Sequence, residues 1–276
     1  QPVEDRSAAL DIAGVTKIYR DFWLRPRVTA VNNISLRVAP GEVFGLLGPN
    51  GSGKSTTLKM ALGLLHPTAG HIRILGGSPK DELARARIGY MPEETYLYRF
   101  LTARETLDFY GRLFGLTPAV RRERVEQLVE MAGLGEAADR RIGEYSKGMA
   151  RKVALAQALI NDPDLLILDE PTSGLDPVAC RRVKDLVLTL AKRGKTVILA
   201  SHHLADVEET CNRVAILFNG SIRAHGPVEE LIRGKKNLEE LFVEVITRAR
   251  REDRPGTHDG GEAPAFLGGR GRSCER

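Results

Sequence analysis

Between an apolar run at residues 42–47 and a helix-like stretch at residues 56–62, the chain reads Gly48-Pro49-Asn50-Gly51-Ser52-Gly53-Lys54-Ser55. This order predicts a strand, a glycine loop and a helix. Such a loop directs backbone N–H groups toward one point at a helix N-terminus, where the macrodipole adds partial positive charge, and so holds phosphate oxygens. Lys54 then reaches the β- and γ-phosphates, the Ser55 hydroxyl ligates Mg²⁺, and Thr56 completes the site. The loop predicts binding of a nucleoside triphosphate.

Length, composition and charge limit the size of the domain and the kind of partner to be expected. With 276 residues, the chain is long enough for one large α/β domain with a buried core. Its hydrophobic content of 42% and charged content of 28% are ordinary for a globular protein. The net charge of +5 comes from scattered Lys and Arg residues, with only short groups such as 121–122 and 181–182. We therefore expect no nucleic-acid partner.

The cysteines and the distribution of apolar residues indicate the cellular compartment. Cys180, Cys211 and Cys274 have no metal-ligand spacing, which predicts a reduced cytosolic protein without a zinc site. The first residues are charged and offer no apolar signal segment, and no stretch approaches the about 18 apolar residues that span a bilayer. Any membrane role is expected to come through a partner.

The residues before the loop and shortly after it predict a second sheet. Strand patterns occur around residues 10–12 and 33–38, separated by an irregular insert at residues 21–27, and a third covers residues 71–75. These strands fit a small antiparallel sheet beside a parallel core, on which a nucleotide base can rest.

Residues 102–160 read as successive helices. Thr102 and Glu105 form a capping box, residues 125–132 carry an apolar face that stops at Gly133, and apolar residues recur at helical spacing from 149 to 160. After this insert, apolar strands at residues 165–168 and 196–200 flank a helix at 177–192, as parallel βαβ units do. From Arg248 to Arg276, few apolar positions occur, and we expect this segment to be mostly disordered.

Two carboxylates follow the strand at residues 165–168. In open parallel sheets, ligand sites lie at the C-terminal ends of strands, where Asp169 and Glu170 are placed. Asp169 then holds Mg²⁺ directly or through water, and Glu170 polarises the water that attacks the γ-phosphate. Taken alone, the pair is equally compatible with helix-capping acids.

Residues 144–177 carry a resemblance to a known family. They include Tyr145-Ser146-Lys147-Gly148-Met149, Leu165-Leu166-Ile167-Leu168-Asp169-Glu170 and Ser173-Gly174-Leu175-Asp176. Over residues 8–240 the chain resembles the ATP-binding-cassette (ABC) family, whose signature is Leu-Ser-Gly-Gly-Gln. The resemblance implies an α/β fold: a P-loop NTPase core with a parallel sheet, an N-terminal antiparallel β subdomain and an inserted α-helical signature subdomain at about residues 95–160. Residues 241–276 then form a C-terminal extension.

The resemblance also implies a composite site. Ser146 and Gly148 of the signature close over the γ-phosphate held by a second subunit, and Asp176 belongs to the dimer-contacting D-loop. Ser146 read alone is more simply an N-cap of the following helix. Lys147 and Met149 depart from the usual Gly and Gln, and Lys147 either adds charge beside phosphate or points to solvent. The Tyr-Ser-Lys-Gly-Met variant looks like that of exporter ATPases.

Three further site residues rest on the resemblance. Glu93 stands where the family has a glutamine that contacts Mg²⁺ and water, and its carboxylate keeps the ligating oxygen but loses the donor and adds charge. We expect Glu93 to belong to the site, with an exposed turn acid as the alternative. His202 occupies the place of the switch histidine that contacts the γ-phosphate, with His203 as a competitor. Tyr19 is placed to stack on adenine, with Phe22 and Trp23 as competitors and core packing as the structural alternative.

By resemblance, the chain is an ATPase that uses ATP and Mg²⁺, dimerises with a copy or a close paralogue, and drives a separate integral membrane permease, with export as the expected direction. It would be cytoplasmic and peripheral on the inner face of the cell membrane. Residues 96–100 would border the groove for the permease, or pack within the helical insert. The alternatives are a soluble ABC ATPase acting on ribosomes or DNA, and a regulatory subunit that binds ATP without hydrolysing it.

Overall fold

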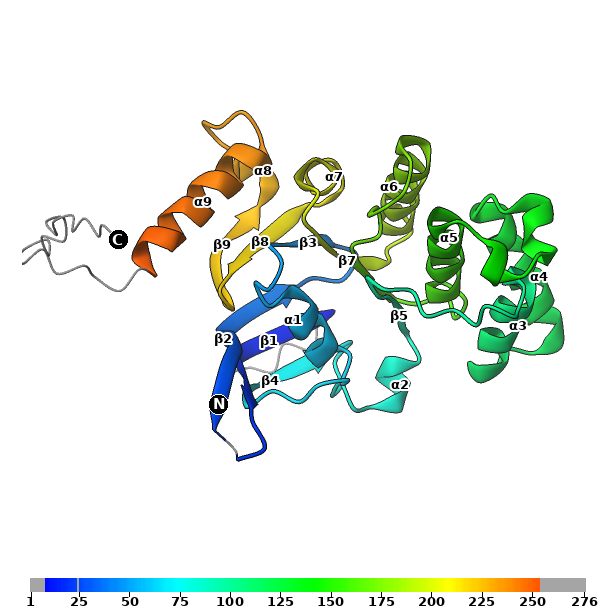
Figure 1. The fold of residues 1–276 in the computed structure, drawn as a ribbon, viewed down its shortest axis with the longest axis horizontal. Helices are drawn as coiled ribbons and strands as arrows, with labels where there is room; N and C mark the ends of the chain where they lie inside the picture. Colours follow the sequence, from blue (N-terminus) through cyan, green and yellow to red (C-terminus); the bar gives the residue numbers. More distant parts are fainter. Residues whose placement is uncertain (1–7, 24, 254–276) are drawn as a thin grey trace, which may run out of the picture.

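The computed structural model describes residues 8–23 and 25–253. Two sheets share the centre of the molecule, the helices α3, α4 and α5 project to one side of it, and α9 lies at the opposite side (Figure 1). Of the three cysteines, Cys180 and Cys211 are free thiols, and Cys274 lies outside the described residues.

An antiparallel sheet has the order β2-β1-β4 and consists of β1 (Leu10–Arg20), β2 (Pro26–Val38) and β4 (Ala69–Ile74). The predicted antiparallel sheet is confirmed, but its first two strands are longer than the sequence pattern indicated. Register shifts let the pairing of β1 with β2 continue as far as Arg20 opposite Pro26. The predicted irregular insert at residues 21–27 is therefore wrong in extent, because bulges absorb the broken alternation that had concealed the strands.

A mixed sheet has the order β5-β6-β7-β3-β8-β9 and is parallel except for the β8–β9 pair. Each face is covered by its own hydrophobic cluster. In β3, for example, Phe44 and Leu46 pack on one side while Val43 and Leu47 pack on the other. This is why the strand sequences are continuous apolar runs. The bounds are β3 (Val43–Leu47), β5 (Ile88–Met91), β6 (Leu165–Asp169), β7 (Thr196–Ser201), β8 (Arg213–Phe218) and β9 (Ser221–Pro227).

The helices connect and flank these strands. The sequence pattern predicted the helix at residues 177–192 with the bounds found for α6. Strands β5, β8 and β9 were not predicted, although Asn219-Gly220 between β8 and β9 is a sequence signal for a hairpin turn. The helices are α1 (Lys54–Ala61), α2 (Glu82–Arg85), α3 (Ala103–Leu113), α4 (Pro118–Met131), α5 (Lys147–Ala158), α6 (Pro177–Lys192), α7 (Leu204–Thr210), α8 (Val228–Leu231) and α9 (Leu238–Glu252), with short 3-10 turns η1 (Gly135–Asp139) and η2 (Ile142–Glu144).

The helical insert begins at the predicted capping box. Thr102 Oγ accepts the Glu105 N–H at 3.1 Å, and Glu105 Oε2 accepts the Thr102 N–H at 2.8 Å, so two free donors of the first turn of α3 are satisfied. The insert runs through α3, α4 and α5 and returns the chain to the mixed sheet at β6.

The C-terminal prediction needs correction. Residues 248–252, expected to be disordered, form the last turn of α9, and the expected domain boundary at residue 240 falls inside the same helix. Asn237 caps the helix and its apolar face is buried, with Ile246 and Ala249 in the core. That face comes from spaced single apolar residues, which low overall hydrophobicity conceals. Residues 254–276 of the predicted disordered segment lie outside the described residues.

Candidate functional site

The phosphate loop leaves the carboxyl end of β3, which lies between β7 and β8 and is buried along its length. Helix α1 then begins at Lys54, with Gly53 as its N-cap at φ 106°. A Cβ on Gly53 would lie 2.6 Å from the Ala30 carbonyl oxygen, so only glycine fits this position. The tight approach brings the N-terminus of α1 close to β2.

Lys54 is the buried cation of the site. Its Nζ donates to the Gly48 carbonyl at 2.7 Å and, more weakly, to the Pro49 carbonyl at 3.4 Å. Burial lowers the pKa of Lys54, and the carboxylates of Glu170, Asp169 and Glu93 oppose that shift. The side chain thus supplies positive charge among three acids, at a loop shaped for anions.

A cavity of about 780 Å³ opens over the loop. It brings together residues from the antiparallel sheet, the phosphate loop and the ends of β5 and β6. Most of the sequence-predicted site residues line it, but Gly48, Pro49, Ser146, Gly148, Asp176 and His202 do not. The lining residues are Tyr19, Val28, Thr29, Ala30, Asn50, Gly51, Ser52, Gly53, Lys54, Ser55, Thr56, Glu93, Asp169, Glu170 and Asn219.

Asp169 ends β6 in a site suited to a cation. Only 2% of the residue is exposed, and burial raises the pKa of its carboxyl group, which a hydrogen bond from Ser55 partly offsets. The negative charge of Glu93 raises the pKa of Asp169 further. Oδ1 of Asp169 is buried without a hydrogen-bond partner among the described residues. An unpartnered carboxylate oxygen beside a hydroxyl and a second carboxylate is the donor set that Mg²⁺ prefers.

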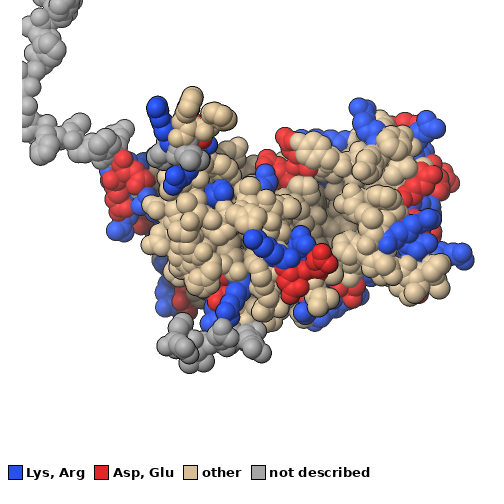
Figure 2. All heavy atoms as spheres, turned by 90° about the horizontal axis from the view of Figure 1, so that it is seen from below, with Lys and Arg blue, Asp and Glu red and all other residues tan. Residues whose placement is uncertain are grey.

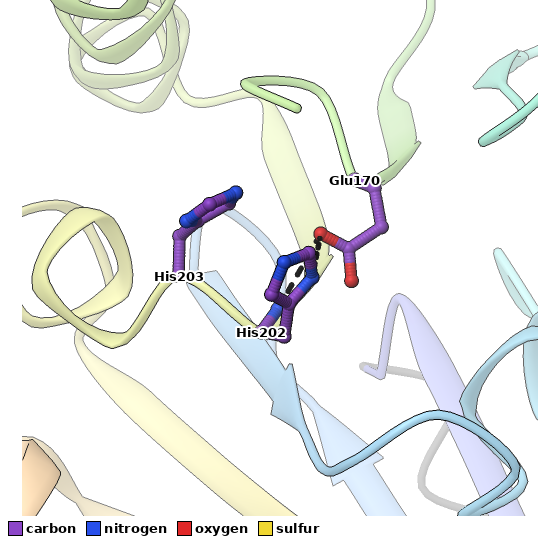
Figure 3. Close-up of side chains that lie close together, drawn as sticks. All are labelled: Glu170, His202 and His203. Atoms are coloured by element: carbon purple, nitrogen blue, oxygen red, sulfur yellow. Dashed lines mark hydrogen bonds and ion pairs between the residues drawn. The ribbon is translucent and has the colours of Figure 1, made fainter. Parts of the chain in front are cut away.

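Glu170 is held beside His202 by the register of the sheet. Asp169 pairs with Ala200 across β6 and β7, so the residues that follow the two strands meet. Glu170 Oε2 lies 2.8 Å from His202 Nδ1 (Figure 3). The same oxygen accepts the Ser201 hydroxyl at 3.3 Å. Glu170 itself is buried and has φ 53°, a left-handed conformation that non-glycine residues seldom adopt at no cost.

Of the two candidate histidines, His202 is the one that contacts Glu170. His203 stacks on His202 with 4.2 Å between ring centroids, and its backbone N–H donates to Ser201 Oγ at 3.0 Å. Figure 3 shows both rings on the same side of the Glu170 carboxylate, and one potential ligand atom from each of the three side chains lies within 4.8 Å of the others. The contact with His202 fixes the Glu170 carboxylate, which is the geometry a general base requires.

Arg151 is a site residue that sequence reasoning missed. It extends from α5, is 3% exposed, and donates through one guanidinium nitrogen to the Glu93 carbonyl at 2.9 Å and through another to the Glu170 carbonyl. Burial lowers its pKa, opposed first by the charge of Glu170. The sequence feature that could have indicated this role is the position of Arg151, five residues after Ser146 in the helix that begins within the signature. Arg151 therefore connects the helical insert to both acids.

Replacing Arg151 with Met is expected to lower ATP turnover about tenfold and the thermal unfolding midpoint by about 5 °C, because two buried carbonyls lose a charged donor. Steady-state ATPase assays and thermal denaturation check this, with Arg122→Met, an exposed arginine on α4, as the matched control. Equal turnover and stability in Arg151→Met and Arg122→Met would contradict the role of Arg151 in connecting α5 to the two acids.

Tyr19 is the aromatic residue that faces the cavity. It is 40% exposed, and Lys17 Nζ lies 5.4 Å from its ring centroid. Phe22 and Trp23 are 90% and 73% exposed, pack edge-to-face on each other and are not part of the cavity lining. An exposed ring on the wall of a nucleotide-sized cavity is placed to stack on a base.

The signature residues lie outside the cavity. Ser146 caps α5, accepting the Met149 N–H at 3.2 Å, and is exposed. The aliphatic end of Lys147 lies against Gly174, and Gly148 lies against Leu175. Asp176 caps α6 through the Ala179 N–H at 2.9 Å, which lowers the pKa of Asp176. Within one chain, these residues form a surface at helix N-termini rather than a part of the loop site.

On the face drawn in Figure 2, groups of Lys and Arg and groups of Asp and Glu lie scattered among other residues, and neither sign of charge covers the face. In the described part of the chain, no helix combines the length and apolar character needed to cross a bilayer.

Comparisons with a family model, with individual relatives and with a solved structure point to the same family. Residues 31–173 match the family described as ABC transporter. An uncharacterized ABC transporter ATP-binding protein of Synechocystis sp. is 42% identical over 82% of this chain, which spans 64% of that protein's length. The Nod factor export ATP-binding protein I of Rhizobium sp. (strain N33) is 44% identical over 81% of this chain and 72% of its own length.

A solved structure agrees in fold. It is a dimeric ATP-binding cassette in a post-hydrolysis state bound to ADP and Pi, 28% identical, with a TM-score of 0.73 over 79% of this chain and 98% of that one.

Proposed function

This chain belongs to the ABC transporter ATP-binding family, and we propose that it is the ATP-binding and ATP-hydrolysing subunit of such a transporter. The observation that carries the proposal is that the phosphate loop, Lys54 and the Asp169–Glu170 pair line one cavity, although they are far apart in sequence. Backbone N–H groups and Lys54 would hold the phosphates, and the Tyr19 ring would stack on adenine.

Ser55, Asp169 and Glu93 would hold Mg²⁺. The unpartnered Oδ1 of Asp169 and the three oxygen-bearing side chains fit this ion. When bound, Mg²⁺ neutralises charge on the phosphates and helps to orient them. Glu93 brings a full charge where the family has an amide, so the metal site of this chain is more acidic than the family pattern.

Glu170 would accept a proton from the attacking water, since Glu170 is among the residues that line the cavity. His202 would hold that carboxylate in place through the 2.8 Å contact and sense the γ-phosphate from its half-exposed position. The left-handed backbone of Glu170 supports this assignment, because strained residues persist where geometry serves a function.

Two chains would close on ATP in a head-to-tail dimer. Ser146 and Gly148 lie at the N-terminus of α5, which favours an anion, yet neither lines the cavity over the phosphate loop of the same chain. A phosphate held by a second copy or a close paralogue would meet this need. The dimeric cassette to which the chain is similar in fold supports the arrangement.

A charge placed at Ser146 tests the dimer. Asp caps a helix as well as Ser does, so Ser146→Asp should keep α5 folded while its carboxylate repels the partner's γ-phosphate. In a Glu170→Gln background, in which ATP turnover is expected to be slow, MgATP should produce dimers in analytical ultracentrifugation, and Ser146→Asp should abolish them.

Ser146→Asn, which keeps the cap without the charge, and Thr117→Asp, which adds the same charge at the N-cap of α4, should both still dimerise. Loss of the dimer in Thr117→Asp, or its survival in Ser146→Asp, would count against the composite site.

Closure of the dimer would act on a separate membrane permease. This partner would hold the chain on the inner face of the cell membrane. Tyr96, Tyr98 and Phe100, just after Glu93, are largely exposed, and Tyr98 also contacts Phe109 of α3 at 6.1 Å between centroids. Such an aromatic patch beside the site suits a protein partner. Export is the direction we propose, because relatives are named for Nod factor export.

A further inference from the structure

The turn between β8 and β9 lies against the phosphate loop. It consists of Asn219 and Gly220, both with positive φ, at 48° and 75°. The Gly220 N–H donates to the Ser52 carbonyl at 3.0 Å, and the Asn32 N–H donates to the Gly220 carbonyl at 2.8 Å. A Cβ on Gly220 would lie 2.9 Å from the Ala30 carbonyl oxygen. The turn is therefore packed backbone to backbone between β2 and the loop.

The bond to Ser52 bears on phosphate binding. In a planar trans peptide, the Ser52 carbonyl and the Gly53 N–H point in opposite directions. Fixing the carbonyl on Gly220 therefore fixes the direction of the Gly53 N–H, and Gly53 lines the cavity. The position of the β8–β9 turn thus orients one of the donors available to the phosphates.

The end of α9 holds this turn in place. The Asn219 side-chain amide donates to Asp253 Oδ2 at 2.8 Å, and Arg223 of β9 donates to Asp253 Oδ1 at 2.7 Å. One carboxylate thus binds both the turn and the strand that follows it. Asp253 is the C-cap of α9, whose buried residues Leu238, Leu241, Ile246 and Ala249 anchor the helix to the core. Figure 1 shows α9 beside β8 and β9 at the edge of the mixed sheet.

We propose that Asp253 is a positioning residue for ATP: through Asn219 it holds the β8–β9 turn against the phosphate loop and so sets the affinity for the triphosphate. Asp253 does not line the cavity, so its effect passes through Asn219, which does. The inference rests on the proposed function, since it concerns ATP at the same loop.

Asp253→Ala is expected to raise the dissociation constant for MgATP about fivefold and to leave turnover at saturating ATP within about twofold of wild type, because the charge-assisted hydrogen bond to Asn219 is lost together with the one to Arg223. Direct binding by calorimetry and steady-state ATPase assays on the full chain measure the two quantities. A change confined to affinity separates positioning from general destabilisation, which lowers the thermal midpoint of the nucleotide-free chain.

Matched variants test whether the effect of Asp253 on ATP affinity passes through Asn219. Glu252→Ala removes the neighbouring 3.6 Å ion pair with Arg223 but no contact to Asn219, and should bind like wild type. Asp253→Asn keeps an oxygen for Asn219 and should recover most of the affinity. Asn219→Gly tolerates the positive φ and removes the amide, so the double variant with Asp253→Ala should bind no more weakly than Asn219→Gly alone.

Two outcomes overturn the inference in distinguishable ways. If wild type binds MgATP and Asp253→Ala binds it equally well, or if the two losses add in the double variant, the positioning role is wrong and the proposed function stands. If wild type does not bind MgATP at all, the proposed function fails and the inference fails with it.

Discussion

Replacing Glu170 with Gln is expected to reduce ATP turnover about 10³-fold while MgATP binding stays within about twofold of wild type, since a positioned general base contributes that order of rate. Gln has the shape of Glu and can still accept from Ser201, so the fold around the site should not change. What would be lost is the negative charge that, on the proposed mechanism, accepts the proton from water.

Single-turnover and steady-state ATPase assays, with binding measured by calorimetry, check this expectation. Glu144→Gln, an exposed acid in η2, is the matched control and should turn over ATP like wild type. Glu170→Asp keeps the charge but retracts it from His202, and should fall between wild type and Glu170→Gln. Hydrolysis at the wild-type rate in Glu170→Gln would remove Glu170 from the mechanism and favour another base.

Replacing Lys54 with Met should weaken MgATP binding about 100-fold, because a buried charged donor to phosphate is lost. Met keeps most of the aliphatic bulk of a side chain that is 6% exposed. Removing the Lys54 ammonium also leaves Asp169, Glu170 and Glu93 without a cation whose charge opposes theirs. The three acids would then repel the phosphates.

Calorimetric titration with MgATP measures the loss. Lys59→Met, an exposed lysine in the last turn of α1, is the matched control and should bind ATP normally. ADP should lose less affinity than ATP in Lys54→Met, since it lacks the γ-phosphate that Lys54 is placed to reach. Equal affinity of Lys54→Met and wild type would place the triphosphate elsewhere.

Much of the fold was open to prediction because its signals are local. The glycine loop between strand and helix, the capping box at Thr102 and the bounds of α6 follow from residues close in sequence. Strands β8 and β9 were missed although their signal is local: the apolar run at residues 213–218 is followed by Asn219-Gly220, a two-residue hairpin turn with positive φ at both positions. The last turn of α9 was missed because its order depends on contacts with β8 and β9.

The sequence by itself determined the chemistry of this protein: a phosphate loop with Lys54, the acids Asp169 and Glu170, and an ordered set of family motifs. Only the tertiary structure decided which groups meet. The pairing of β6 with β7 puts His202 rather than His203 on Glu170, Arg151 crosses from α5 to two backbone carbonyls, and Asp253 binds Asn219 in the turn whose Gly220 contacts the phosphate loop. These contacts join residues far apart in the chain, and strand order and helix packing, which no local pattern encodes, set them.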